Sequence, residues 1–211
     1  MTTSLSRKMA HLASISYLAS SRCKSIKYYD AINDSIQFEN IVFDRLRSTC
    51  NVLVFYNKKN RDLYIVHRGT DTNGKYCGAD ILANIHIIFG NIKGCINLKN
   101  RSETTEKVIR YYKKRRMVRR IYGSGHSLGG TTLYKTLFIN PYVRKNIRRT
   151  YHFNEVYTSK HSKKTSKEIK KRISNIAVHY RTKCDIISKF MEFSKPIGKV
   201  VTIKKIITFD S

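Results

Sequence analysis

Residues 121–130 read Ile-Tyr-Gly-Ser-Gly-His-Ser-Leu-Gly-Gly, and this stretch decides the fold. Within it, residues 125–129 fit the pattern Gly-x-Ser-x-Gly, in which a serine occupies a tight turn between a strand and a helix. Such a turn strains the backbone of the serine, and a side chain at Gly125 or Gly129 would collide with the crossing strand or helix. The pattern predicts a nucleophile elbow with Ser127 at its tip, flanked by His126 and Leu128.

The flanking sequence agrees with this prediction. Residues 118–122 have the apolar content of a short strand, and residues 131–138 have the apolar face of a helix, with Pro141 as a stop signal. Upstream, the apolar runs 51–56 and 62–67 enclose the polar turn 57–61. This arrangement predicts a hairpin whose strands are buried on both faces.

The remaining chain alternates between helical and extended patterns. We expect further helices at 4–20, 79–89 and 102–116, a loop at 69–78, a lysine-rich insertion at 160–172, and further strands at 38–43, 151–156, 175–180 and 199–209. The 102–116 helix would place Glu103 and Glu106 in its first turn and basic residues in its last, which complements the helix dipole. The pattern predicts one α/β domain over residues 1–211. Its central sheet would be mostly parallel and covered by helices on both faces, as a three-layer sandwich.

The chain is strongly basic. It carries 42 Lys and Arg residues against 14 Asp and Glu residues, a formal net charge of +28. Such a surface attracts polyanions, so electrostatic association with an anionic membrane surface is one expectation. No basic motif interleaved with aromatic residues indicates specific nucleic-acid recognition. The excess of Lys, Ile, Asn and Tyr is also what an A/T-rich genome supplies, such as that of a large DNA virus, and this is a second explanation of the charge.

The cysteines and the apolar segments restrict the class of protein. The five cysteines are odd in number and lack the spacing of a metal site, so we expect reduced thiols, an intracellular location, and neither a metal nor another cofactor. No apolar run approaches the roughly 18 residues that a membrane span requires. In the apolar stretch at residues 9–19, His11 and serines lower the hydrophobicity. The stretch therefore predicts an amphipathic helix rather than a signal peptide.

Three segments supply groups suited to acyl transfer. Ser127 is the candidate nucleophile, and its hydroxyl needs a histidine base oriented by a carboxylate. Asp185 is the best carboxylate, because it follows the strand at 175–180, where open α/β sheets place their sites. Its alternative role is that of a solvated loop residue or a helix cap. The hydroxyl and backbone N–H of Thr70, together with the backbone N–H of Leu128, would donate to an oxyanion.

These segments, in this order, resemble the class 3 lipase family. The resemblance rests on Arg68-Gly69-Thr70, on Asp80-Ile81-Leu82, on the hexapeptide at 125–130 and on the segment at Asp185, and it extends over about residues 5–190. It implies an α/β-hydrolase fold and the hydrolysis of acyl esters, commonly glycerolipids, through an acyl-enzyme. It also implies Ser127 as nucleophile, Asp185 as the triad aspartate, Thr70 as the oxyanion hydroxyl and His126 as a packing residue.

The sequence departs from that family in its histidines. The family's catalytic histidine follows the aspartate, whereas the histidines here, at positions 11, 67, 86, 126, 152, 161 and 179, all precede Asp185. We therefore expect either a chain shortened at its C-terminal end or another histidine in this role. His161 is the weak candidate, because His179 lies within a predicted strand and is expected to be a core residue.

Two functions follow as expectations. The first is a serine esterase or lipase that acts on a lipid or small ester substrate through Ser127. The second is a catalytically impaired hydrolase fold that serves as a basic binding module for anionic membrane or nucleic acid. The missing histidine and the net charge of +28 motivate the second.

Overall fold

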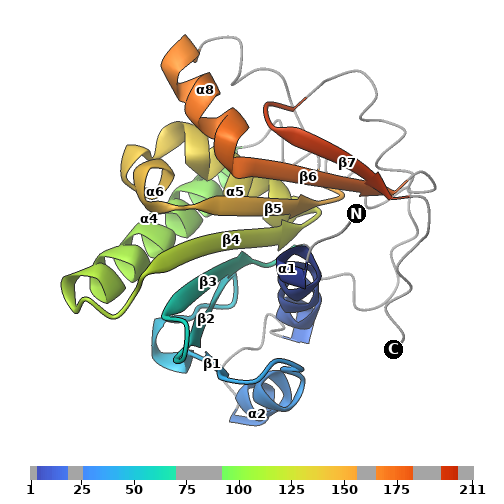
Figure 1. The fold of residues 1–211 in the computed structure, drawn as a ribbon, viewed down its shortest axis with the longest axis vertical. Helices are drawn as coiled ribbons and strands as arrows, with labels where there is room; N and C mark the ends of the chain where they lie inside the picture. Colours follow the sequence, from blue (N-terminus) through green and yellow to red (C-terminus); the bar gives the residue numbers. More distant parts are fainter. Residues whose placement is uncertain (1–3, 19–25, 70–91, 156–164, 183–195, 204–211) are drawn as a thin grey trace.

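One sheet of seven strands organises the computed structural model, which describes residues 4–18, 26–69, 92–155, 165–182 and 196–203 (Figure 1). The strands lie side by side in sequence order: β1 (Ile41–Phe43), β2 (Val52–Asn57), β3 (Asp62–His67), β4 (Arg120–His126), β5 (Arg149–Phe153), β6 (Ala177–Thr182) and β7 (Lys199–Ile203). β1 to β3 pair antiparallel, and β3 to β7 pair parallel. The mostly parallel sheet expected from the sequence is confirmed.

Helices cover both faces of the sheet. α1 (Ser4–Ile15) and α2 (Ile26–Asp34) pack on one face, whereas α4 (Ile92–Lys114), α5 (Leu128–Ile139), α6 (Pro141–Asn146) and α8 (Lys167–Ile176) pack on the other (Figure 1). Two 3-10 helices, η1 (Ser16–Leu18) and η2 (Arg45–Arg47), follow α1 and β1. The three-layer α/β architecture is therefore also confirmed.

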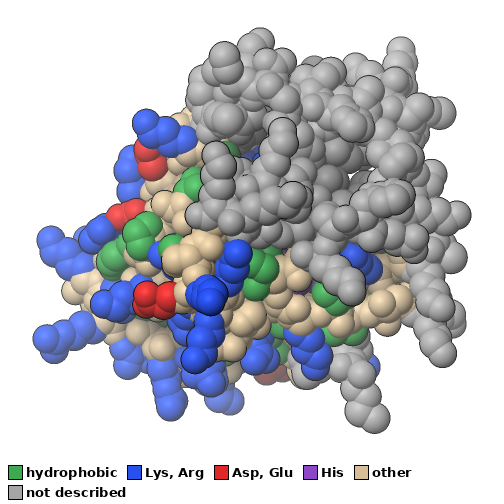
Figure 2. Space-filling model, turned by 90° about the horizontal axis from the view of Figure 1, so that it is seen from above, with side chains coloured by type: hydrophobic (Ala, Val, Ile, Leu, Met, Phe, Trp, Pro, Cys, Tyr) green, Lys and Arg blue, Asp and Glu red, His purple; other side chains and the backbone are tan. Residues whose placement is uncertain are grey.

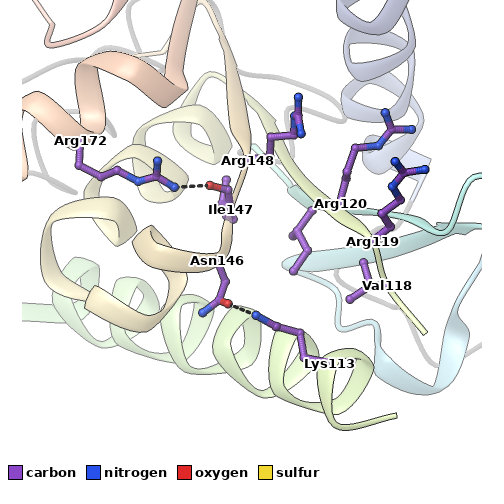
Figure 3. Close-up of a pocket in the computed structure, with 9 residues that line it drawn as sticks. Lys113, Val118, Arg119, Arg120, Asn146, Ile147, Arg148 and Arg172 are labelled. Atoms are coloured by element: carbon purple, nitrogen blue, oxygen red, sulfur yellow. Dashed lines mark hydrogen bonds between the residues drawn. The ribbon is translucent and has the colours of Figure 1, made fainter. Parts of the chain in front are cut away.

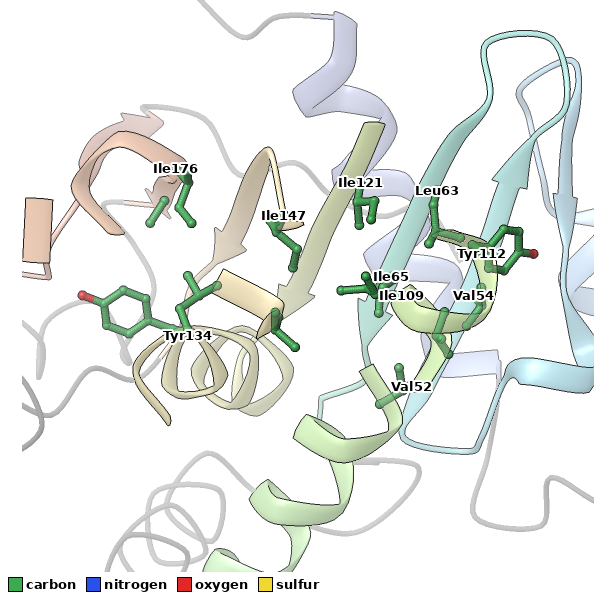
Figure 4. Close-up of a cluster of buried hydrophobic side chains, with 14 of the residues drawn as sticks. Val52, Val54, Leu63, Ile65, Ile109, Tyr112, Ile121, Tyr134, Ile147 and Ile176 are labelled. Carbon is green, nitrogen blue, oxygen red and sulfur yellow. The ribbon is translucent and has the colours of Figure 1, made fainter. Parts of the chain in front are cut away.

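Each face of the sheet packs on its own hydrophobic cluster, because successive strand residues point to opposite faces. The cluster under α4, α5, α6 and α8 takes alternate residues of the hairpin, namely Val52, Val54, Leu63 and Ile65 (Figure 4). The cluster under α1 and α2 takes the residues between them, namely Leu53, Phe55, Tyr64 and Val66. The hairpin strands are buried on both faces, as their dense apolar content predicted.

The helix predicted at 102–116 begins at Ile92 instead, which corrects the interpretation of its acidic residues. Glu103 and Glu106 lie in the body of α4 and not in its first turn. There they form pairs one turn away along the helix, Glu103 with Lys99 and Glu106 with Arg110. The sequence hid the true start because Gly94 and several polar residues weaken the helical pattern there. The basic last turn is confirmed.

The observed ends of other helices and strands differ from the predicted ones by a few residues. Pro141 does more than stop α5, because it occupies the first turn of α6, where a missing N–H costs nothing. Asn140 caps that helix by accepting a hydrogen bond from the Val143 N–H at 3.0 Å. The strand predicted at 175–180 starts at Ala177, since α8 extends to Ile176. The helix predicted at 79–89 lies outside the described residues.

Replacement of a core leucine tests the packing of α5 against the sheet. Leu137 is fully buried in the cluster under α5, so Leu137→Ala should lower the free energy of unfolding by about 2–5 kcal/mol in chemical denaturation. Leu46 is 85% exposed, and Leu46→Ala should change the same quantity by less than about 0.5 kcal/mol. Similar losses in the two variants would contradict this packing.

Candidate active site

Ser127 forms the turn between β4 and α5. Its backbone has φ 51° and ψ −125°, which residues other than glycine seldom adopt. Two hydrogen bonds hold this conformation: the Ser127 N–H donates to the Phe153 carbonyl at 2.9 Å, and the Thr131 N–H donates to the Ser127 carbonyl at 3.0 Å. The predicted strand–turn–helix geometry is present, with a strained residue at its tip.

Two glycines allow α5 to approach the sheet closely. A Cβ atom at Gly125 would lie 2.4 Å from the carbonyl carbon of Gly129, in the first turn of α5. A Cβ atom at Gly129 would lie 2.0 Å from the His67 carbonyl oxygen, on β3. Both contacts are with backbone atoms, which cannot rotate away. The steric reason for glycine at these two positions is therefore the one that the sequence predicted.

The end of β3 also reaches the elbow. A Cβ atom at Gly69 would lie 2.9 Å from the carbonyl oxygen of His126, the residue that precedes Ser127. The Nδ1 of His126 is hydrogen-bonded to the Tyr17 hydroxyl at 2.7 Å. This bond connects the elbow to η1, the segment after α1. The expected role of His126 as a packing residue stays a prediction, and this contact is consistent with it.

Of the other predicted site residues, the structure describes Leu128 but not Thr70 or Asp185. Leu128 is the first residue of α5, so its backbone N–H has no acceptor within the helix. Thr70 and Asp185 lie outside the described residues. Thr70 directly follows Gly69, and Asp185 comes three positions after Thr182, the last residue of β6. β3, β4 and β6 run parallel, so both residues follow strands that end at the same edge of the sheet as Ser127. We call this edge the carboxyl edge.

A row of buried histidines lies beneath α5, which the sequence did not reveal. His67, Gly125, His152 and His179 are neighbours in register across β3, β4, β5 and β6. All three histidine side chains are fully buried. They face the same side of the sheet, and Gly125 leaves the gap into which the first turn of α5 fits. Hydrogen bonds from this row fix the position of the helix that carries Ser127.

His67 joins β3 to two helices. Its Nε2 lies 2.9 Å from the Thr105 hydroxyl on α4, and its Nδ1 lies 3.2 Å from the Thr132 hydroxyl on α5. Burial, and next the nearby Arg101 charge, hold the pKa of His67 well below its usual value. Burial likewise lowers the pKa of Arg101 to about 10. Arg101 donates to the backbone carbonyl of Arg68 at 2.5 Å and so holds the chain directly after β3.

His152 is hydrogen-bonded as a neutral ring. Its Nδ1 donates to the Gly130 carbonyl at 3.0 Å, and its Nε2 accepts from the Thr150 hydroxyl at 2.8 Å. Burial, reinforced by the adjacent His179, keeps its pKa well below the usual value. The bond to Gly130 anchors the first turn of α5 from below.

His179 pairs with Glu155, a residue that sequence reasoning missed. The Nδ1 of His179 lies 2.5 Å from Glu155 Oε1, and its Nε2 lies 3.2 Å from the Ile197 carbonyl. A carbonyl only accepts, so Nε2 donates the second of these hydrogen bonds. The second carboxylate oxygen, Oε2, is buried and has no hydrogen-bond partner among the described residues. The expectation that His179 is a core residue agrees with its burial.

No described histidine is hydrogen-bonded to the Ser127 hydroxyl. The rings of His67, His152 and His179 are engaged at both nitrogens. His161, the candidate base, lies outside the described residues, as does His86. A base for Ser127 is therefore expected outside this buried row.

Comparison with known proteins bears on the fold. No family model and no curated protein sequence matches the chain. Its structure matches that of a triacylglycerol lipase whose catalytic centre is formed by a serine protease triad, with a TM-score of 0.55 and 15% identity, over 90% of this chain and 76% of that one. The chain has a lipase-like α/β-hydrolase fold.

A second solved structure supports the same conclusion. It is the Rhizomucor miehei lipase in a propeptide complex, with a TM-score of 0.50 and 14% identity, over 88% of this chain and 63% of that one. At such identities the similarity establishes the lipase-like fold alone. Within the described ranges, no helix has the length and apolar character to cross a membrane, and no three His, Cys, Asp or Glu side chains are grouped so that they could hold a metal ion.

The buried histidines predict a loss of stability in acid. The unfolded chain binds protons on His67 and His152 below about pH 6.5, whereas the folded chain does not, because burial lowers both pKa values. The free energy of unfolding should therefore fall as the pH drops below about 6.5, by about 1.4 kcal/mol per pH unit for each ring. Above that pH both rings are neutral in both states, and this contribution is constant.

The variant His152→Gln isolates one of these protons. The glutamine binds no proton in either state, so the slope of unfolding free energy against pH between about pH 6 and 5 should decrease by about 1 kcal/mol per pH unit. Chemical denaturation at each pH measures the slope, and the difference at pH 8 gives the purely structural cost of the substitution. A slope equal to that of the wild type would show that His152 does not titrate differently on unfolding.

Proposed function

We propose that the protein is a serine ester hydrolase that cleaves acyl esters, with glycerolipids as the expected substrate class, through Ser127. One observation carries the proposal: the strained, positive-φ conformation of Ser127 between β4 and α5. A backbone strained in this way persists only where the surrounding structure enforces it, and it commonly marks a functional residue. Here Gly125 and Gly129 allow the close packing of α5 that enforces it.

The proposed reaction follows from the groups at the carboxyl edge. The Ser127 hydroxyl attacks the acyl carbonyl, and a histidine accepts its proton while Asp185 orients that histidine. The backbone N–H of Leu128 and the hydroxyl and N–H of Thr70 stabilise the oxyanion. The alcohol leaves with a proton from the histidine, and water then hydrolyses the acyl-enzyme. The contact between Gly69 and the His126 carbonyl supports the role of Thr70, because it brings that segment next to the elbow.

The proposed base is His161. The described histidines of the buried row have both ring nitrogens engaged, which favours a histidine outside the row. His161 belongs to the segment between β5 and α8, and β5 ends at the carboxyl edge. This assignment uses a histidine that precedes the aspartate in the chain, unlike the order in the class 3 lipases that the sequence resembles.

Loss of the nucleophile gives the first test of the proposed function. Ser127→Ala should abolish covalent labelling by a fluorophosphonate probe and lower the hydrolysis of a short-chain p-nitrophenyl ester by about 1000-fold or more. Ser174→Ala, a matched substitution on the exposed surface of α8, should retain both. Wild-type protein that remains unlabelled, while a known serine hydrolase in the same reaction is labelled, would refute the proposed activity and favour the impaired, binding-module alternative.

Removal of the Thr70 hydroxyl tests the oxyanion site. Thr70→Ala should lower kcat by about 100- to 1000-fold and leave KM nearly unchanged, because the lost hydrogen bond forms mainly in the transition state. Fluorophosphonate labelling of Ser127 should become slower without disappearing. Thr202→Ala, on the exposed side of β7, is the matched control. An unchanged kcat in Thr70→Ala would exclude this hydroxyl from the oxyanion site.

A further inference from the structure

A basic cleft opens at the edge of the sheet opposite Ser127, where β4 and β5 begin. We call this edge the amino edge. The cleft has a volume of about 300 Å³, which is within the range of small-molecule sites. Five cationic side chains line it, namely Lys113, Arg119, Arg120, Arg148 and Arg172 (Figure 3). No lining residue is acidic or aromatic among those that the structure describes.

Three basic runs that are distant in the sequence meet at this cleft. Residues 113–120, 144–149 and 170–172 consist largely of Lys and Arg, and they precede β4, β5 and β6, respectively. These strands are parallel neighbours, so they all start at the same edge. The space-filling view shows many Lys and Arg side chains and few Asp and Glu side chains on the described part of the surface (Figure 2).

The positive charge in the cleft is largely uncompensated. Arg120 is neutralised, because it forms a two-point ion pair with Asp62 at 2.7 and 2.9 Å. Within the described part of the chain, Lys113, Arg119, Arg148 and Arg172 have no carboxylate within ion-pair distance. Four cationic residues that line one small cavity raise the positive potential there, and this potential attracts an anion.

Neutral groups orient two of these cations without cancelling their charge. The ammonium group of Lys113 donates to the Asn146 side-chain oxygen at 2.5 Å, and the Arg172 guanidinium donates to the Ile147 carbonyl at 3.2 Å (Figure 3). The guanidinium groups of Arg119 and Arg148 form no ion pair with another described residue. Their planar forks match two phosphate oxygens at once, which makes arginine well suited to phosphate recognition.

We infer that this cleft binds a compact, multiply phosphorylated small molecule. The absence of an aromatic lining residue removes the stacking platform that single-stranded nucleic acid uses. β4 separates the cleft from Ser127 by seven residues, or about 20 Å. A membrane docked at the amino edge would hold Ser127 on the far side of the protein, away from its lipid substrate. A soluble phosphorylated ligand has no such conflict. This choice over a membrane rests on the proposed function, whereas the attraction of the cleft for an anion rests on its own charges.

Calorimetric titration with inositol hexakisphosphate at about 0.15 M salt tests this inference. The wild type and Ser127→Ala should bind it equally, with one site. The double variant Arg119→Gln/Arg148→Gln should bind at least about tenfold more weakly, because each arginine supplies charge-assisted hydrogen bonds. The double variant Arg7→Gln/Lys99→Gln removes the same charge from exposed positions outside the cleft and should retain the wild-type affinity.

Two results would overturn the inference. One is an equal loss of affinity in both double variants, which would show that the net charge alone attracts the ligand. The other is a cleft-dependent preference for a different polyanion: tighter binding of either duplex DNA or phosphatidylserine vesicles than of inositol hexakisphosphate, weakened by Arg119→Gln/Arg148→Gln. The first preference would assign the cleft to nucleic acid and the second to a membrane surface. Thermal unfolding of each variant checks that its fold is intact.

Discussion

The close approach of α5 to the sheet is the contact on which the rest of the candidate site depends. Gly129 lies against the backbone of β3, and Gly125 lies against the first turn of α5. No side chain fits between these backbones, so the chain must reverse within the single residue Ser127. The unusual backbone angles of this serine are thus imposed by packing. The same packing brings the end of β3 beside the residue that precedes the serine.

The row of buried histidines, His67, His152 and His179, stabilises this packing on the sheet side of α5. An apolar layer could hold a helix in many orientations, whereas hydrogen bonds from His67 and His152 to α5 fix its first turn. Burial lowers the pKa values of His67 and His152, so these hydrogen bonds depend on both rings being neutral. The pair of His179 and Glu155 extends the row to β6, where a buried carboxylate is hydrogen-bonded to the ring. The buried histidines of this row therefore contribute to the position of Ser127, although none of these three is hydrogen-bonded to it.

The two edges of the parallel sheet have different chemistry. The carboxyl edge gathers the turn at Ser127 and the segments that lead to Thr70 and Asp185. The amino edge gathers basic runs, which a net charge of +28 by itself would not place together. A compositional bias toward lysine explains the number of charges, but it does not explain a cleft lined by four arginines and one lysine. The basic cleft and the candidate nucleophile Ser127 thus lie at opposite edges of the sheet.

The sequence alone determined the features whose causes are local. The elbow at Ser127, the requirement for Gly125 and Gly129 and the hairpin of β2 and β3 follow from sterics and periodicity within a few residues. The start of α4, the partnership of Glu155 with His179, and the cleft beside Arg119 and Arg148 were decided by the tertiary structure. These features join residues that are distant in the chain and depend on strand register and helix packing. A shift of one residue in register would turn His152 to the opposite face, and no local pattern specifies that alignment.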